Sequence, residues 1–558
     1  MVAGAFILIQ WKEHKTKFNE ADRRMPGGLL PLVAYGNMNQ TINGNPQMTY
    51  FYKAFVRHTH FSQENITVPL DGPNELQLDA PILLKTKVPR HGDLMSDMYL
   101  TLELPAIYNK LWNGRTSHEF SWIRQIGLRM ISRVGLYIGG TKVQEYSSDW
   151  LAAKYQTDLS IDAFEKWSNL IGDVPEMYAP ASGAYADPSG GYPNVIPFPN
   201  ITTQTNAPSI PAREINVPLG FFFTDSPGLA LPMVGLQYHD IEVQITLRPM
   251  REIYTILDIS GVRVRNGYSL NSVQGTSIYA NSYPPAYGPL PESLNNNYQS
   301  YYDVSGTPRN FYTDIGFGIP TSDGFPMNPR LQCTYIYLTD NERKLFASKK
   351  LEYLVRQVQE FQFPNVNTRQ QLQLDAHALV SRIIWFGRRS DWWYHNDYTN
   401  LTNWKYTDPQ KRPFVRAPAG FNSQTSGGQI LGTQRHILRG ARILCGGNEI
   451  FEEKNARYFS DIVPFRSCTG GGYPFLLGGL LQPLSFHPLY VYSFALNSSS
   501  GIQPSGTINT SRIVKIDLEV DVVPLPADVN YTYDISVYVE SLNFLEIQSG
   551  MGGMRFAI

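Results

Sequence analysis

The segment VKIDLEVDV, residues 514–522, decides the fold class, because apolar and charged residues alternate along it without a break. Side chains on a β-strand point alternately to opposite faces of the sheet, so this segment is expected to bury one face and expose the other. Residues 535–540, ISVYVE, alternate in the same way. Two such segments close together predict an antiparallel β-sandwich.

The same alternation appears far upstream, in MYLTLEL at residues 98–104 and in IEVQITL at residues 241–247. The chain contains 34 Tyr, 28 Phe, 45 Gly and 39 Pro, which is typical of strands joined by many turns. Its 558 residues exceed the usual size of a single hydrophobic core. We therefore expect an all-β fold with two sandwiches in tandem.

Helices are predicted at two places. Residues 149–171 place Trp and Phe among polar residues, and Thr339 with Glu342 has the form of a capping box at a helix start. The buried stripe of this second helix is expected to consist of Leu345, Phe346 and Leu351. Because the helix stands between two strand-rich parts of the chain, we expect it to connect them.

The expected organisation has four parts. They are an N-terminal arm (1–44), a first sandwich (45–338), a connecting helix (339–350) and a second sandwich (351–558). Two irregular stretches, near residues 173–212 and 265–330, are rich in turn-forming residues. Long irregular insertions lie on the surface of a sandwich, so both are expected to cover its outer face.

Charge and cysteine content exclude several classes of protein. A net charge of −1 argues against a chain that coats nucleic acid, which usually needs a basic face. Three widely spaced cysteines, without a Cys-x-x-Cys pair, fit neither a disulfide framework nor a zinc site. No apolar run approaches the roughly 20 residues of a membrane-spanning helix.

Motifs of catalysis are absent from the sequence. It contains no Gly-Lys dipeptide, and hence no Walker-type phosphate loop, and no Gly-x-Ser-x-Gly or His-Glu-x-x-His motif. His58 and His60 would share one face of a strand, but no third metal ligand lies nearby. We therefore expect no catalytic, cofactor or metal site.

Residues 388–394, RRSDWWY, form the most distinctive cluster of side chains. Two arginines and three aromatic residues could stack on bases or sugars. The favoured interpretation is a loop that is packed at a domain or subunit contact and rich in cation–π pairs.

Several phrases, taken in order, resemble the signature of the major capsid proteins of nucleocytoplasmic large DNA viruses. In the first half they are GGLLPLVAYG (27–36), GNPQMTYF (44–51), RHT (57–59), RHGDL (90–94), LYIGG (136–140), PLGFFF (218–223) and PGLALP (227–232). In the second half they are LYVYSFAL (489–496), PSGT (504–507), SR (511–512) and SGMGG (549–553). The resemblance spans about residues 25–558 and omits mainly the two insertions.

The resemblance implies two eight-stranded jelly rolls in tandem and a homotrimer that forms a pseudo-hexagonal capsomer. Such capsomers would tile the icosahedral shell of a large double-stranded DNA virus, with minor capsid and penton proteins and an internal membrane as further partners. The chain would be made in the host cytoplasm, act in the virion capsid, and need neither cofactor nor direct contact with nucleic acid.

Family members usually begin near the phrase MPGGL, here residues 25–29. Residues 1–24 are therefore either a true extension or an unused upstream start, and the second is favoured. If they are present, the apolar run at residues 5–11 would contact the internal membrane or a neighbouring capsomer.

Two other functions remain open on the sequence. One is a minor capsid or scaffold paralogue of the same family. The other is a jelly-roll carbohydrate-binding module that uses Trp392, Trp393 and Tyr394.

Overall fold

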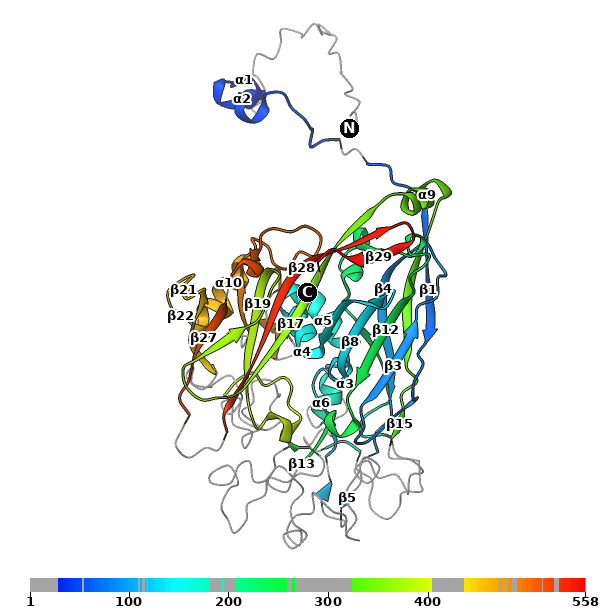
Figure 1. Cartoon of the computed structure of the whole chain (residues 1–558), viewed down its shortest axis with the longest axis vertical. Helices are drawn as coiled ribbons and strands as arrows, with labels where there is room; N and C mark the ends of the chain where they lie inside the picture. Colours follow the sequence, from blue (N-terminus) through cyan, green and yellow to red (C-terminus); the bar gives the residue numbers. More distant parts are fainter. Residues whose placement is uncertain are drawn as a thin grey trace, which may run out of the picture. The chain divides into compact units, whose positions relative to one another are not determined.

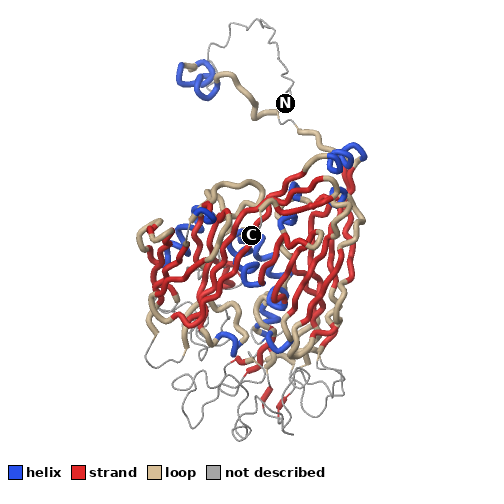
Figure 2. The backbone as a smooth tube through the Cα atoms, viewed as in Figure 1, coloured by secondary structure: helices blue, strands red, loops and turns tan. Residues whose placement is uncertain are grey.

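Long antiparallel strands dominate the part of the chain that the computed structural model describes (Figure 2). The described residues are 29–52, 55–108, 111–112, 116–117, 119–180, 192–194, 207–257, 263–265, 324–403, 436–470, 474–477, 480–483, 489–513, 515–525 and 531–556. The chain divides into a small unit, Met1–Thr59, and a large unit, His60–Ile558. Each is described by itself.

The first sandwich of the large unit consists of two antiparallel sheets. One sheet has the order β1-β16-β4-β10 and the other the order β3-β12-β8-β9. The bounds are β1 Phe61–Pro69, β3 Ile82–Lys87, β4 Leu94–Leu104, β8 Ile131–Ile138, β9 Thr141–Ser147, β10 Arg213–Pro218, β12 Ile241–Leu247 and β16 Arg330–Leu338. Short accessory strands are β2 Glu75–Leu76, β5 Leu111–Trp112, β6 Thr116–Ser117, β7 Ser121–Trp122, β11 Leu231–Pro232, β13 Tyr254–Leu257, β14 Arg263–Val264 and β15 Phe325–Pro326.

The second sandwich also has two sheets, in the orders β17-β28-β19-β25 and β18-β27-β20-β21. The bounds are β17 Leu351–Val366, β18 Gln370–Leu374, β19 Leu379–Arg389, β20 Leu438–Cys445, β21 Asn448–Glu449, β25 Tyr490–Ser493, β27 Ile516–Val522 and β28 Tyr533–Gln548. Accessory strands are β22 Lys454–Asn455, β23 Pro474–Leu477, β24 Leu480–Pro483, β26 Ile508–Asn509 and β29 Met551–Met554. Figure 1 shows β17, β28 and β19 side by side, as their pairing requires.

The two sandwiches have the same topology. When the principal strands of each are numbered one to eight along the chain, both have one sheet in the order 1-8-3-6 and another in the order 2-7-4-5. This arrangement is the jelly roll, a double-sheet architecture of eight strands. The predicted fold, two tandem eight-stranded jelly rolls, is confirmed.

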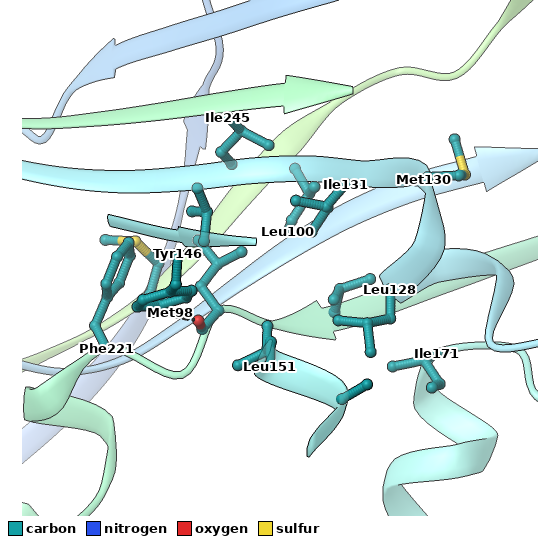
Figure 3. Close-up of a cluster of buried hydrophobic side chains, with 14 of the residues drawn as sticks. Met98, Leu100, Leu128, Met130, Ile131, Tyr146, Leu151, Ile171, Phe221 and Ile245 are labelled. Atoms are coloured by element: carbon teal, nitrogen blue, oxygen red, sulfur yellow. Dashed lines mark hydrogen bonds between the residues drawn. The ribbon is translucent and has the colours of Figure 1, made fainter. Parts of the chain in front are cut away.

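Apolar side chains on the inner faces of the sheets form the cores. In the first sandwich, Met98 and Leu100 of β4 lie opposite Ile245 of β12 and Ile131 of β8 (Figure 3). A separate cluster fills the second sandwich, and Trp385 is its largest member that is almost fully buried.

The two segments that predicted the fold behave differently. In β27 the apolar residues are buried as expected, but Asp517 is buried as well, because it pairs with Lys515 and accepts a hydrogen bond from Gln371. In β28 the prediction of a solvated face is wrong, since Tyr538 and Glu540 are fully buried. That face of β28 is covered by the first sandwich.

Helices occupy the connections. The α-helices are α1 Leu30–Val33, α2 Asn37–Asn43, α3 Ile126–Met130, α4 Ser148–Asp158, α5 Ile161–Leu170, α6 Pro175–Tyr178, α9 Asp340–Ser348 and α10 Val463–Ser467. A π-helix, η13 Tyr458–Ile462, runs into α10, and 3-10 turns are η3 Phe222–Thr224, η4 Pro227–Leu229, η5 Met233–Gly235, η6 Met250–Glu252, η8 Trp392–His395 and η14 Thr510–Arg512. The helical region predicted at 149–171 is confirmed as α4 and α5.

Helix α9 forms where it was predicted, but the capping box and the buried stripe were wrong. The Thr339 side chain makes no capping hydrogen bond, and no residue of α9 is buried. Arg343 holds the helix instead, because its Nε donates to Asp93 Oδ1 at 2.8 Å. Phe346 is only partly buried, against Leu94 and its neighbours.

Most of the two predicted insertions lies outside the described residues, including 181–191, 195–206 and 266–323. The part of the first insertion that is described contains α6, and the end of the second contains β15, which pairs with β2. Within the described ranges, no helix is both long enough and apolar enough to span a membrane.

Candidate functional site

Helix α4 forms the contact between the two jelly rolls. It begins directly where β9 ends, so its first turn is held at the edge of the first sandwich. Leu151 points into the core of that sandwich (Figure 3). Trp150, one residue earlier, reaches the outer face of β28 in the second sandwich, where its Nε1 donates to Glu540 Oε1 at 2.8 Å. One helix therefore contacts both sandwiches.

Glu540 is the centre of a buried ionic network at this contact. Arg382 of β19 forms a two-pronged pair with it, donating from Nε to Oε2 at 2.6 Å and from Nη2 to Oε1 at 3.0 Å. Neither side chain has any exposed surface. With Trp150 as a third donor, the Glu540 carboxylate is fully hydrogen-bonded, as a buried charge requires.

The last residue of α4, Asp158, extends the network. Arg382 Nη1 donates to Asp158 Oδ1 at 2.8 Å, and Arg356 Nη1 of β17 donates to Asp158 Oδ2 at 3.2 Å. Arg356 also donates through Nη2 to the carbonyl of Ser499 at 3.1 Å. Two arginines of the second sandwich thus face Asp158 of the first sandwich and Glu540 of the second, so the charges balance.

A second cluster lies at the other end of α4. Asp149 accepts from Arg388 of β19, with Nη1 2.9 Å from Oδ2, and also pairs with Arg129 of α3. Arg388 packs over the rings of Phe386 and Trp392, with its Cζ 4.9 and 5.2 Å from their centres. Asp149 thus joins an arginine from each sandwich.

The arginines at the contact keep the two aspartates of α4 charged. Burial by itself would raise the pKa of Asp158, but Arg382 and Arg356 lower it to about 2. Burial acts in the same direction on Asp149, and Arg388 and Arg129 hold its pKa well below the usual range. Groups with such pKa values do not exchange protons near neutral pH, so the arrangement suits a fixed structural contact rather than acid–base chemistry.

Replacing Asp158 with Asn is expected to weaken the fall in the free energy of unfolding that accompanies acidification. A carboxyl whose folded-state pKa is depressed stabilises the fold above its unfolded pKa, here about 3.8, and loses that contribution as pH falls towards the folded value of about 2. The difference corresponds to about 2 kcal/mol. Urea denaturation of both proteins between about pH 5 and pH 2 should show the gap in unfolding free energy shrinking. A difference in unfolding free energy that stays constant over this pH range would contradict the lowered pKa of Asp158.

The residues singled out from the sequence fall in two groups. Arg388 is buried at the domain contact, which confirms the favoured interpretation of the 388–394 cluster. Arg389 is buried within the second sandwich, where it pairs with Asp391 and lies over the Tyr531 ring. His58 and His60 are exposed. In the described ranges no three His, Cys, Asp or Glu side chains gather as a metal site would need.

The small unit carries a second candidate surface. Its helices α1 and α2 are short, and no residue of α2 is buried. Met38, Tyr50, Phe51 and Val56 are between 89% and 99% exposed within the described chain. Several strongly exposed apolar side chains in one short segment suit packing against a partner.

Comparison with known proteins finds two family models that match this chain. A family model described as "Major capsid protein N-terminus" matches residues 49–283, and one described as "Large eukaryotic DNA virus major capsid protein" matches residues 342–553.

Individual relatives agree with these matches. The chain is 24% identical to "Probable capsid protein 4" of Acanthamoeba polyphaga mimivirus, over 95% of this chain and 99% of that one. It is 25% identical to the major capsid protein of Paramecium bursaria Chlorella virus 1, over 96% of this chain and 100% of that one. A structure of the capsid of the same Chlorella virus superposes with a TM-score of 0.57 at 21% identity, covering 91% of this chain and 100% of that one.

Proposed function

This chain belongs to the family of major capsid proteins of large eukaryotic DNA viruses, and from that premise we propose that it forms homotrimers whose six jelly rolls make a pseudo-hexagonal capsomer. Such capsomers would tile an icosahedral shell. The observation that carries the proposal is the buried ionic contact around Glu540, which fixes two sandwiches of identical topology in one orientation.

A fixed pair of jelly rolls is a suitable unit for ring closure. Closed rings require each subunit to present two different surfaces at a constant angle. The ion pairs between α4 and the second sandwich resist changes in that angle, because separating them would leave charges buried without partners. Three copies would then alternate first and second sandwiches around the ring.

Further contacts are part of the same proposal. The exposed apolar side chains of the small unit suit packing against a neighbouring subunit or capsomer. Minor capsid proteins, penton proteins and an internal membrane are proposed as the other partners in the virion. A shell separated from its genome by lipid has no need to neutralise phosphate, which is consistent with a net charge of −1 and with no direct contact to nucleic acid. Synthesis in the host cytoplasm is proposed with it, as is a purely structural role without catalysis.

The two alternatives differ in how well the observations support them. A carbohydrate-binding module would need Trp392 and Trp393 on an open surface, whereas both are partly buried against the core of the first sandwich. A minor capsid or scaffold paralogue has the same fold and is distinguished by its copy number in the particle.

The native mass of the purified chain tests the proposal. With a subunit of 63.1 kDa, light scattering should give about 189 kDa for a closed trimer. Negative-stain images should show particles with a hexagonal outline. A stable, folded monomer of 63.1 kDa at micromolar concentration would overturn the trimer and favour a binding module.

A further inference from the structure

The internal repetition of the chain predicts where a second copy binds. In both sandwiches a helical segment follows the fifth strand: α4 after β9 in the first, and η13 with α10 after β21 and β22 in the second. Within one chain, α4 packs on the outer face of the 1-8-3-6 sheet of the second sandwich. The corresponding sheet of the first sandwich is β1-β16-β4-β10. Among the described elements, helices α3 and α5 of the same chain pack at its edge strand β10, and no α-helix packs closely on β1, β16 or β4.

A shared irregularity fixes the alignment of the two sheets. Strands β4 and β19 are both third strands, and both have 11 residues. The pairing of β4 with β16 skips Ser96, and the pairing of β19 with β28 skips Ser381. Asp97 follows the first skipped serine as Arg382 follows the second, so Asp97 and Arg382 occupy equivalent positions. Six residues further on, Glu103 is equivalent to Arg388.

The charges at these equivalent positions are inverted. The second sandwich presents Arg382 and Arg388 to Asp158 and Asp149, the acids at the two ends of α4. The first sandwich presents Asp97 and Glu103 instead. A helical segment that binds this face as α4 binds the second sandwich must therefore carry two basic residues, with the same spacing as the two acids of α4.

The helical segment of the second sandwich has this pattern. In α4, Asp149 is the second helical residue and Asp158 the eleventh. In the helical run that begins at residue 456, Arg457 is likewise the second residue and Arg466 the eleventh. Both arginines are exposed, and within the described residues neither has an ion-pair partner. Between them the segment exposes 56% of Ile462 and 93% of Phe465, a large apolar surface for so short an element.

The outer face of the β1-β16-β4-β10 sheet carries more acidic than basic side chains around Asp97 and Glu103. Glu103 and Glu214 share Arg330, at 2.8 and 3.2 Å, so two carboxylates meet one guanidinium. Asp97 has no ion pair within the described part of the chain, and partial burial raises its pKa.

We propose that the segment 457–466 of one copy docks on the outer face of the β1-β16-β4-β10 sheet of a second copy, with Arg466 facing Asp97 and Arg457 facing Glu103. This contact between copies repeats the contact that α4 makes within each chain, and it names the surface on which the proposed closed ring depends. The inference rests on the proposed trimer and deepens it.

Charge reversal and exchange test the proposal in the full-length chain. Arg466→Glu and Asp97→Lys should each raise the dissociation constant of the trimer at least about tenfold, measured by light scattering on dilution. Because every copy carries both changes, the double variant should restore the trimer. Arg512→Glu, the same reversal at an exposed arginine elsewhere, is the matched control and should leave the trimer unchanged.

Cross-linking gives a second, independent readout. A photoreactive benzoylphenylalanine in place of Phe465 should couple to residues 94–104 or 330–338 of another chain, as mapped by peptide mass spectrometry. Trimers that survive both reversals, or cross-links that map only to other strands, would overturn this contact while leaving the proposed trimer in place. A wild-type chain that stays monomeric would overturn the proposed function and this contact together.

Discussion

Replacing Arg382 with alanine is expected to lower the free energy of unfolding by about 3–5 kcal/mol. Arg382 has no exposed surface and pairs with both Glu540 and Asp158, so its removal leaves two carboxylates in the interior without their main counter-charge. The loss should be measured by urea denaturation at neutral pH.

The matched control is Arg369→Ala. Arg369 also pairs with an acid, Glu453, but its side chain is 48% exposed, and exposed pairs contribute less than about 1 kcal/mol. If the two variants lost similar stability, the contact around Glu540 would not be the strong element that its burial indicates.

Replacing Trp150 with alanine should cost a similar amount, about 3–5 kcal/mol, for a different reason. The indole is fully buried between the sandwiches, and its loss leaves a cavity at the contact and removes one of the hydrogen bonds to Glu540. Trp150→Phe keeps most of the apolar contact and removes only the hydrogen bond, so about 1–3 kcal/mol is expected. Urea denaturation of both variants separates the two contributions.

Tyr238→Ala is the control for loss of an aromatic ring, since Tyr238 is 75% exposed and should change stability by less than about 0.5 kcal/mol. Because Trp150 and Arg382 both bond to Glu540, Trp150→Phe and Arg382→Ala should not be additive. Additive effects would mean that the two residues act separately and that Glu540 does not couple them.

The sequence predicted the strands well because alternation is a local property. Residues 98–104 and 241–247 each bury one face against a core that lies within the same sandwich, so the pattern and the environment agree. The jelly-roll topology and the family also followed from local phrases taken in order.

The ionic contact could not be predicted in this way. Glu540 stands at a position of β28 that alternation assigns to solvent, and its partner Trp150 is 390 residues away. The local sequence around a solvated carboxylate does not differ from that around a carboxylate buried in an ion pair with a distant arginine. The one signal available was the cluster at 388–394, where arginines among aromatic residues indicated a packed contact. The capping box failed for the opposite reason, since a local motif was present but Arg343 and Asp93 hold α9 instead.

The 390 residues between Trp150 and Glu540 also bear on how the chain folds during synthesis. The first sandwich can complete its own sheets once β16 has been made. The acids of α4 must wait for the arginines of β17 and β19, and Trp150 must wait for Glu540 of β28. Contacts of such long range are slow to form, and the intermediate exposes aromatic surface while it waits. If the chain is made in many copies at once, as the proposed shell would require, the α4 of one chain can meet the β19 of another during this interval. Rapid completion of the C-terminal strand, or a chaperone that covers α4 until then, would raise the yield of correctly paired chains.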